Sequence, residues 1–416
     1  VIEVFLPSSP SRGDTIALVD YSGTFSTNQL IINTGGQLID STSGPDFKVT
    51  TNNSIVELVY IDANKGWQVI LNQAAGTTPD GTLSRTSGGG YDTTTFVEAT
   101  GGTILTNGDF KTHIFTGSGN FVVSGVATTS ANNVAEYIVV GGGGGGGKFG
   151  TAAGAVQGAG GGGAGGWRHF SSLDCTPPAK APAGVTLTAT TFPITIGAGG
   201  TQAPTNSSSG NAGGVSTFST ITSAGGGGGG SAGTPNGDGG SGGSGGGGSG
   251  MQGPQGQSCG GAGNTPPVSP PQGSDGGNGS ARTAAPASNS GGGGGGGAGQ
   301  AAPDNSVHKD DGGPAGNGLF VVPGFFGPTA PSFGQSPSPL APNGRYFAGG
   351  GGGGSANTPG GQGQPGAGGG GIGGNASNPH GAATANTGGG GGGPSSTPQA
   401  LGTGGSGFIA IRYKFQ

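Results

Sequence analysis

Charged side chains are scarce in this chain: Lys, Arg, Asp and Glu make up only 7% of its 416 residues, and the formal net charge is −5. The few basic residues are scattered, so there is no basic stripe to meet phosphates, and nucleic acid is excluded as a partner. No stretch approaches the roughly eighteen apolar residues of a membrane-spanning helix, so we expect no membrane insertion. The first residues, VIEVFLPSSP, lack the positively charged region of a signal peptide.

Residues that usually carry catalysis or bind metals are equally sparse. The two cysteines, Cys175 and Cys259, form no CxxC or Cys/His cluster, and we expect both to be free thiols. No Ser/His/Asp or paired-carboxylate motif stands out. The sequence therefore predicts no enzyme, no cofactor and no metal site. The four histidines lie far apart and lack HxH or HExxH spacing; they are His113, His169, His308 and His380.

Glycine is the residue in excess, with 109 copies beside 29 prolines. Such a composition without a strict period is typical of disorder, because glycine loses more backbone entropy on ordering than other residues. Two features argue against disorder here. Apolar segments bracket the glycine tract at both ends, and the tract contains uninterrupted runs where a flexible linker would mix glycine with serine. These runs are Gly141–Gly147, Gly225–Gly230, Gly291–Gly297, Gly349–Gly354 and Gly388–Gly393.

Uninterrupted glycine can form an extended helix of three residues per turn, which rises about 3.1 Å per residue. This helix makes no internal hydrogen bonds, so neighbouring helices have to satisfy its N–H and C=O groups. Without Cβ atoms the helices pack backbone to backbone, and Cα–H···O contacts add a little. The sequence therefore predicts a polyglycine II sandwich over residues 141–406, with the glycine runs inside, variable loops between them, and almost no α-helix.

Segments rich in Val, Ile, Thr and aromatic residues flank the glycine tract. Residues 1–75 contain short runs of this kind separated by turn residues, which predicts an all-β module. Residues 76–109 are interpreted as a linker and connection, and residues 110–140 as a β element that leads into the glycine tract. The final residues 407–416 alternate in the manner of a strand. We expect this closing strand to pair with Ala135–Val140.

The N-terminal module carries apolar residues on both faces of one predicted strand. Ile55, Val59 and Ile61 fall on one face, while Val56 and Leu58 fall on the other. A module of about 75 residues has too little interior to bury both faces alone. We therefore expect it to assemble with copies of itself.

Three further stretches stand out. Arg12-Gly13-Asp14 matches an integrin-type tripeptide, but a turn before the strand Thr15–Val19 explains it more simply. The bulky sequence from Trp167 to Phe170 interrupts the glycine tract, and we interpret it as a packing collar against the β element.

The segment 303–347 is the longest interruption between glycine runs and gathers aromatic residues among Gly, Ser, Asn and Pro. This composition is typical of a rigid binding loop. The alternative is that these aromatics cover the flank of the sandwich or contact a neighbouring subunit, because so many could not all stay exposed. The candidate receptor-binding residues are Phe325, Phe326, Phe333, Arg345 and Tyr346.

Several stretches in succession resemble the glycine-rich domain of bacteriophage tail-fibre and adhesin proteins. They are HIFTGSGNFVV, EYIVVGGGGGGG, GAGGGGAGGW, ITIGAGGT, GGVSTFSTITSAGGGGGG and GGSGFIAIRY, within residues 110–416. The resemblance implies a polyglycine sandwich whose distal loops contact the host surface. It also implies a virion location, a homotrimer, other virion proteins as partners, and a host surface glycan or outer-membrane protein as receptor.

Two other functions fit the composition. Some ice-binding proteins are polyglycine sandwiches, but a flat ice-binding face needs Ala or Thr repeated at every third position. The other alternative is an extracellular matrix or surface protein rich in glycine, which a secretion signal in the full gene would favour.

Overall fold

The structure is a computed structural model in which the chain divides into two compact units, Val1–Thr94 and Thr95–Gln416. Each unit is described by itself. The structure describes residues 1–41, 46–72, 96–152, 155–173, 183–205, 208–232, 237–252, 257–282, 289–305, 310–327, 333–336, 345–356, 361–396 and 402–416.

The N-terminal unit consists of two three-stranded sheets, with strand orders β1-β3-β4 and β2-β5-β6. Their side chains enclose one core, in which Phe47, Leu58 and Trp67 are almost completely buried. The predicted all-β module is therefore confirmed. The strands are β1 (Ile2–Phe5), β2 (Thr15–Val19), β3 (Leu30–Asn33), β4 (Phe47–Val49), β5 (Ile55–Asp62) and β6 (Gly66–Asn72).

The Arg12-Gly13-Asp14 tripeptide lies in the turn that enters β2. The Asp14 N–H donates to the Ser11 carbonyl at 3.0 Å, and the Ser11 N–H donates to the Asp14 carboxylate at 2.8 Å. Gly13 has a φ of 91°, which favours glycine at this position. The turn interpretation is confirmed.

The second unit begins with two sheets that pack around a shared aromatic core. The closing sheet is six-stranded, with the order β14-β11-β23-β9-β8 and β15 paired to β11. A five-stranded sheet has the order β18-β17-β16-β10-β7. The strands are β7 (Glu98–Thr100), β8 (Thr103–Asn107), β9 (Phe110–Phe115), β10 (Gly119–Gly125), β11 (Val134–Val140), β14 (Trp167–Phe170), β15 (Val185–Thr186), β16 (Thr191–Thr195), β17 (Ser216–Phe218), β18 (Ile221–Ser223) and β23 (Phe408–Lys414).

The final strand of the chain, β23, lies between β11 and β9 and is antiparallel to both. Its pairing with β11 joins Val140 to Phe408 and Glu136 to Arg412. The predicted pairing of Ala135–Val140 with the closing strand is therefore confirmed. Ile409, Ile411 and Tyr413 enter the core between the sheets, which explains the alternation in the sequence.

The segment 76–109, interpreted as a linker and β connection, contains β-structure in its second half. Strands β7 and β8 lie within it, and they pair with β10 and β9 at the edges of the two sheets. Their short, Thr-rich sequences carry few apolar residues because edge strands are half exposed. Residues 73–95 lie outside the described part of the chain.

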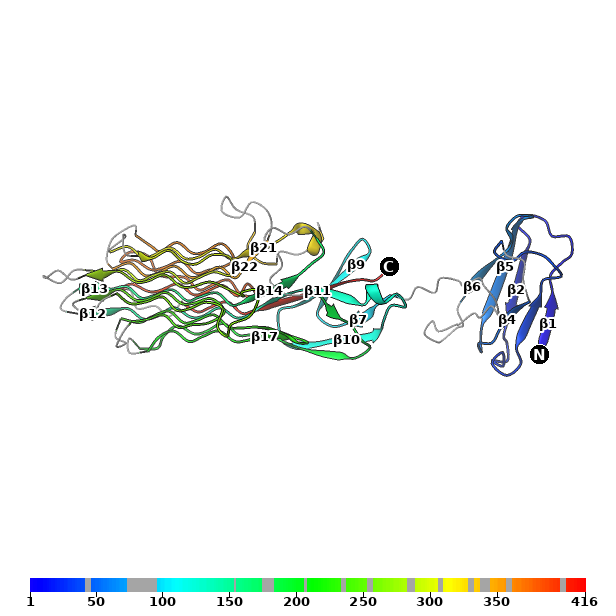
Figure 1. Ribbon diagram of the computed structural model, residues 1–416, viewed down its shortest axis with the longest axis horizontal. Coiled ribbons are helices and arrows are strands. Elements are labelled where there is room, and N and C mark those ends of the chain that lie inside the picture. The colour runs from blue at the N-terminus through cyan, green and yellow to red at the C-terminus, as the bar shows by residue number, and fades with distance from the viewer. Residues whose placement is uncertain are drawn as a thin grey trace. The chain divides into compact units, whose positions relative to one another are not determined.

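Beyond the sheets, the chain runs back and forth as long extended rods (Figure 1). In Gly141–Gly147 the N–H groups donate to three different neighbouring rods in turn, at 2.7 to 3.0 Å. This rotation confirms three residues per turn and the predicted mutual hydrogen bonding of the runs. The pairs are Gly141–Gly166, Gly144–Gly163 and Gly147–Gly160 on one side, Gly142–Gly214 and Gly145–Asn211 on the second, and Gly143–Gly405 and Gly146–Gly402 on the third.

The rods of this array divide into interior and outer rods. The interior rods include Gly141–Gly147, residues 158–166 and Gly291–Gly297, and all of their residues are buried. A Cβ placed on Gly145 would lie 2.1 Å from the Thr201 carbonyl oxygen. The interior is thus a hydrogen-bonded network in which most positions have no room for a side chain, although the methyl groups of Ala159 and Ala164 are buried in the rod 158–166.

The outer rods bury only every third residue. Gly197, Gly200 and Ala203 face inward and are buried, whereas Ala198 and Thr201 are exposed. Asp and Asn side chains on neighbouring outer rods accept hydrogen bonds from some outward-facing N–H groups. The Asp238 carboxylate accepts from the Cys259 N–H, and the Asp275 carboxylate accepts from the Gly263 N–H, both at 2.7 Å. Side chains therefore complete the hydrogen bonding along this flank.

Helical structure in the described residues consists of short 3-10 turns, such as η1 (Ser130–Asn132) and η3 (Pro323–Phe325). Among the residues that the structure describes, none forms a helix with the length and apolar character needed to cross a membrane.

Candidate functional site

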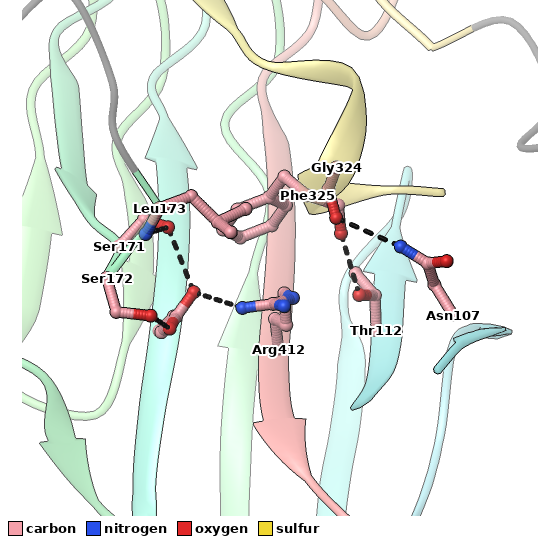
Figure 2. A network of polar contacts seen from close by, with 9 residues as sticks. Asn107, Thr112, Ser171, Ser172, Leu173, Gly324, Phe325 and Arg412 are labelled. Atoms are coloured by element: carbon pink, nitrogen blue, oxygen red, sulfur yellow. Dashed lines mark hydrogen bonds and ion pairs between the residues drawn. The ribbon is translucent and has the colours of Figure 1, made fainter. Parts of the chain in front are cut away.

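The aromatic segment 303–347 is docked on the closing sheet. Its described parts include β21 (Leu319–Val321), η3 and β22 (Arg345–Phe347), and β21 pairs with β22. Two contacts fix η3 to the sheet (Figure 2). The Thr112 hydroxyl donates to the Phe325 carbonyl at 3.1 Å, and the Asn107 amide donates to the Gly324 carbonyl at 3.2 Å. From β21 onward, the described residues of the segment thus lie at the end of the rods where the sheets are. Residues 310–318 instead belong to the rod array, where the Gly313 N–H donates to the Gly292 carbonyl at 2.8 Å.

Three of the five candidate receptor residues belong to the core. Phe325 and Phe326 are 0% and 4% exposed, so the expectation that these two contact a receptor is wrong. Phe333 is partly buried and packs on Phe408 with ring centroids 5.7 Å apart. The alternative, that the aromatics cover the flank of the fold, holds for these residues. The face of the closing sheet that lies under η3 needs an apolar cover.

Arg345 and Tyr346 are half-buried on β22. The Arg345 guanidinium donates to the Ser336 hydroxyl at 2.8 Å, and the Tyr346 ring lies 5.4 Å from the Phe320 ring. Of the five candidates, these two and Phe333 keep exposed surface. Residues 328–332 and 337–344 of the same segment lie outside the described residues.

A buried ion pair lies under η3, between β11 and β23 (Figure 2). The Arg412 guanidinium donates to the Glu136 carboxylate at 2.7 Å, and both side chains are less than 10% exposed. Ser171 donates to the same carboxylate at 2.9 Å, and Ser172 donates to its other oxygen. The guanidinium also lies 3.6 Å from the centre of the Phe110 ring.

This network ties the last strand of the chain to the residues that follow β14. Sequence reasoning did not single out Glu136 or Arg412. A signal was available: each is a charged residue at an inward position of an apolar strand, and the predicted pairing of the two strands brings them opposite each other. A buried charge needs such a partner.

Replacing Arg412 by methionine is expected to lower the free energy of unfolding by about 3–5 kcal/mol, because it leaves the Glu136 carboxylate buried without its partner. Urea denaturation of the full chain would measure this. The double variant Glu136→Leu, Arg412→Met removes both charges and should recover most of the loss. Lys414→Met is the control, since its pair with Asp109 is 4.0 Å long and exposed. A loss for Arg412→Met no larger than for the control would contradict the assignment.

The opposite end of the rods carries the turns of the glycine tract. The hairpin of β12 (Gly150–Ala152) and β13 (Ala155–Gln157) lies there, far from the sheets (Figure 1). The pair of β19 (Met251–Gln252) and β20 (Ala281–Arg282) also follows rods that run away from the sheets. We call this the distal end. Buried serines mark the points where rods terminate there, among them Ser231, Ser249, Ser290, Ser355 and Ser395.

The distal connections are held to the rods by polar contacts. The Lys148 N–H donates to the Ser231 hydroxyl at 2.6 Å, and the Lys148 ammonium donates to the Pro204 carbonyl at 3.2 Å. The Val156 N–H donates to the Asn289 side chain at 3.1 Å. The interior rods consist almost entirely of glycine, so the larger side chains at this end belong to the connections. The rods hold these connections in a fixed position.

His169 and His380 are buried side chains of the fold. Burial lowers the pKa of His169 to about 4, against a smaller opposing effect of Glu136, and burial lowers the pKa of His380 to about 4. No group of three or more His, Cys, Asp or Glu that could hold a metal occurs among the described residues. Cys259 is an exposed free thiol, while Cys175 and His308 lie outside the described residues.

The collar interpretation of the bulky stretch after the second interior rod is confirmed. Trp167 is fully buried against Phe347 at a ring distance of 6.0 Å, and Phe170 lies 6.5 Å from Tyr137 on the other face of the sheet. Strand β14 thereby joins the rod array to both cores.

Comparison with protein families matches residues 116–414 to the glycine-rich domain family. The match covers the strand β10, the strands β11, β14, β15 and β23 of the closing sheet, and the whole rod array, and the chain belongs to this family. No curated protein matches the chain.

Proposed function

We propose that the chain is a structural fibre or appendage protein of a bacteriophage virion, which attaches to the host surface through the distal connections of its rods. The observation that carries this proposal is that the rods and the connections between them differ in their side chains. Interior rods are nearly free of side chains, whereas the distal connections carry larger side chains on a fixed base. Such a scaffold suits recognition by loops, as in other binding proteins. The resemblance to phage adhesins supports the same function.

The proposed role is binding without catalysis. The partners would be other virion proteins and a host surface glycan or outer-membrane protein. Arg345 and Tyr346 keep exposed surface, but they lie near the sheets, so we place the receptor contact on the distal connections instead.

Cell binding tests this proposal. The fluorescently labelled full chain would be applied to a panel of Gram-negative cells that lack single outer-membrane proteins or carry truncated lipopolysaccharide. We expect saturable binding that one surface defect abolishes. Replacing residues 151–156 of the distal hairpin by a Gly-Ser turn should weaken binding at least tenfold, whereas Arg345→Ala with Tyr346→Ala should leave it unchanged. Binding that survives every distal replacement would contradict the proposal.

Ice binding is less well supported by the outer rods. A flat ice-binding face requires one small residue repeated at every third outward position. The exposed outward residues instead differ in size and charge; they include Ala198, Thr201, Asp238, Asp275 and Gln364.

We propose further that the N-terminal unit forms a homotrimer. Phe5 on β1, and Val19 and Tyr21 at the end of β2, are 66%, 59% and 97% exposed, and both strands lie at sheet edges. Exposed apolar side chains on edge strands favour association, and a trimer would multiply weak receptor contacts.

Sedimentation equilibrium of the full chain at micromolar concentration should give three times the 38.8 kDa chain mass. Phe5→Ser with Val19→Ser should shift it toward the monomer. Ile104→Ser, at an exposed residue of the second unit, is the matched control and should leave the mass unchanged. A stable monomer would contradict the assembly, and a dimer would reject the three-fold arrangement.

A further inference from the structure

Two histidines are buried on opposite faces of the closing sheet. His113 on β9 is 0% exposed, and His169 on β14 is 2% exposed. His113 lies opposite Ile411, which faces the core between the two sheets. His169 lies opposite Ile138, which faces the core under η3. Each core that holds β23 in place therefore contains one imidazole.

The contacts of His113 fit the neutral ring. Its Nδ1 lies 2.7 Å from the Gly101 carbonyl oxygen, and its Nε2 lies 3.0 Å from the Tyr413 hydroxyl on β23. Because a carbonyl can only accept, we assign the proton to Nδ1, so that Nε2 accepts from the Tyr413 hydroxyl. A second proton on Nε2 removes the acceptor that this hydroxyl uses.

The hydrogen bond to the Gly101 carbonyl favours a positive charge on His113, but burial opposes that charge more strongly. The Phe121 ring of β10 lies 5.0 Å away, edge to face. Burial lowers the pKa of His113, and Lys111 on the same strand lowers it further. Glu98 of β7 acts on Tyr413, whose pKa burial raises to about 12. The closed sheet therefore favours a neutral His113.

His169 lies among rings, with Trp167 at 5.7 Å and Phe325 of η3 at 6.4 Å. The charged groups on this face are Glu136 of β11 and Arg412 of β23. The Glu136 carboxylate already accepts from Arg412, Ser171 and Ser172, so it is poorly placed to balance a second cation. Burial outweighs its attraction and holds the pKa of His169 at about 4.

We propose that the closing sheet is an acid-sensitive lock, in which protonation of His113 and His169 releases β23 from between β11 and β9. Release of β23 also frees the adjoining rod ends, because the Gly407 N–H donates to the Gly197 carbonyl at 2.8 Å. The proposal depends on where the two histidines lie. Each core contains one imidazole: His113 is on β9, next to β23, and His169 is on β14, next to β11.

The sign of the pH dependence follows from which state binds protons. An opened or unfolded chain binds protons near the ordinary histidine pKa of about 6.5, and the closed sheet resists them. The closed sheet is therefore fully favoured above about pH 6.5 and loses stability as the pH falls toward 4. For His169, proton binding is roughly 300-fold weaker in the closed sheet, so the opening equilibrium should rise on the order of 100-fold by pH 4.

Hydrogen exchange of the full chain, read by mass spectrometry and normalised to intrinsic rates at each pH, tests the lock. Between pH 7 and pH 4.5 we expect protection at residues 408–414 to fall at least tenfold, while Gly291–Gly297 keeps its protection. His113→Gln and His169→Gln should each reduce this pH dependence. His380→Gln is the control, since His380 is a buried histidine of the rod array, and it should leave the exchange of β23 unchanged.

Three outcomes would overturn the proposal. One is unchanged protection of β23 down to pH 4.5. Another is loss of protection in the rods together with β23, which would indicate global unfolding. The third is an unchanged acid response in the histidine variants, which would assign the opening to Glu136 instead. If a variant does not fold, the pattern in the unaltered chain still decides between local release and global unfolding.

Discussion

Replacing Gly295 by alanine is expected to destabilise the glycine-rich domain by about 3 kcal/mol or more. Gly295 is buried at the centre of an interior rod, and its N–H donates to the Gly351 carbonyl at 2.8 Å. A Cβ there would lie 2.0 Å from the Gly162 carbonyl oxygen. That neighbour is backbone held by its own hydrogen bonds, so two rods have to separate. Valine at the same position should cost more.

Urea denaturation of the full chain would measure this loss. Gly117→Ala provides the matched control, because a Cβ at Gly117 meets nothing within 4 Å. The control should stay within about 0.5 kcal/mol of the unaltered chain. If Gly295→Ala proves as mild as Gly117→Ala, the rods are not packed backbone to backbone.

Deleting residues 408–416 is expected to unfold the closing sheet and to loosen the rod ends that adjoin it. Strand β23 supplies Phe408 to one core and Ile409, Ile411 and Tyr413 to the other, and each of these four side chains is 0% exposed. Burial of such a side chain contributes roughly 1.5–3 kcal/mol, so their combined loss, on the order of 8 kcal/mol, approaches the whole stability of a typical domain.

Limited proteolysis and thermal melting would show this loss. A chain that lacks only Gln416, which is exposed, should behave as the full chain does. A truncated chain with unchanged protease resistance would mean that β23 does not hold the closing sheet together.

The parts of the fold that the sequence predicts are those where one backbone requirement governs every residue. An interior rod excludes side chains at nearly every position, so Gly141–Gly147 is recognisable without knowledge of its neighbours. The pairing of β11 with β23 was predictable because both strands are apolar and bracket the tract.

The outer rods escaped prediction because only every third residue faces inward. The rod that contains Ser258 and Gly261 has both of these buried, while Cys259 and Ala262 between and after them are exposed. The recoverable signal was a small residue at every third position, which a search for uninterrupted glycine overlooks.

The candidate site could be predicted only in part. The aromatic content of residues 303–347 is the same for a binding loop and for a core cover. What separates the two is the apolar face of β11 and β23, where Ile138 and Phe408 need a cover. Since η3 reaches that face from about two hundred residues away, spacing in the sequence carries no sign of the contact.

The central claim is a hydrogen-bonded lattice of helices with three residues per turn. Residue-resolved amide exchange in one interior and one outer rod tests it most directly. In Gly141–Gly147 every N–H donates to a neighbouring rod, so all seven amides should exchange slowly. In the outer rod, the N–H groups of Gly200 and Ala203 donate to Gly143 and Gly146, so these two should be slow, while Ala198 and Thr201 exchange fast. Uniformly fast exchange in both rods, or protection without this three-residue period, would contradict the account.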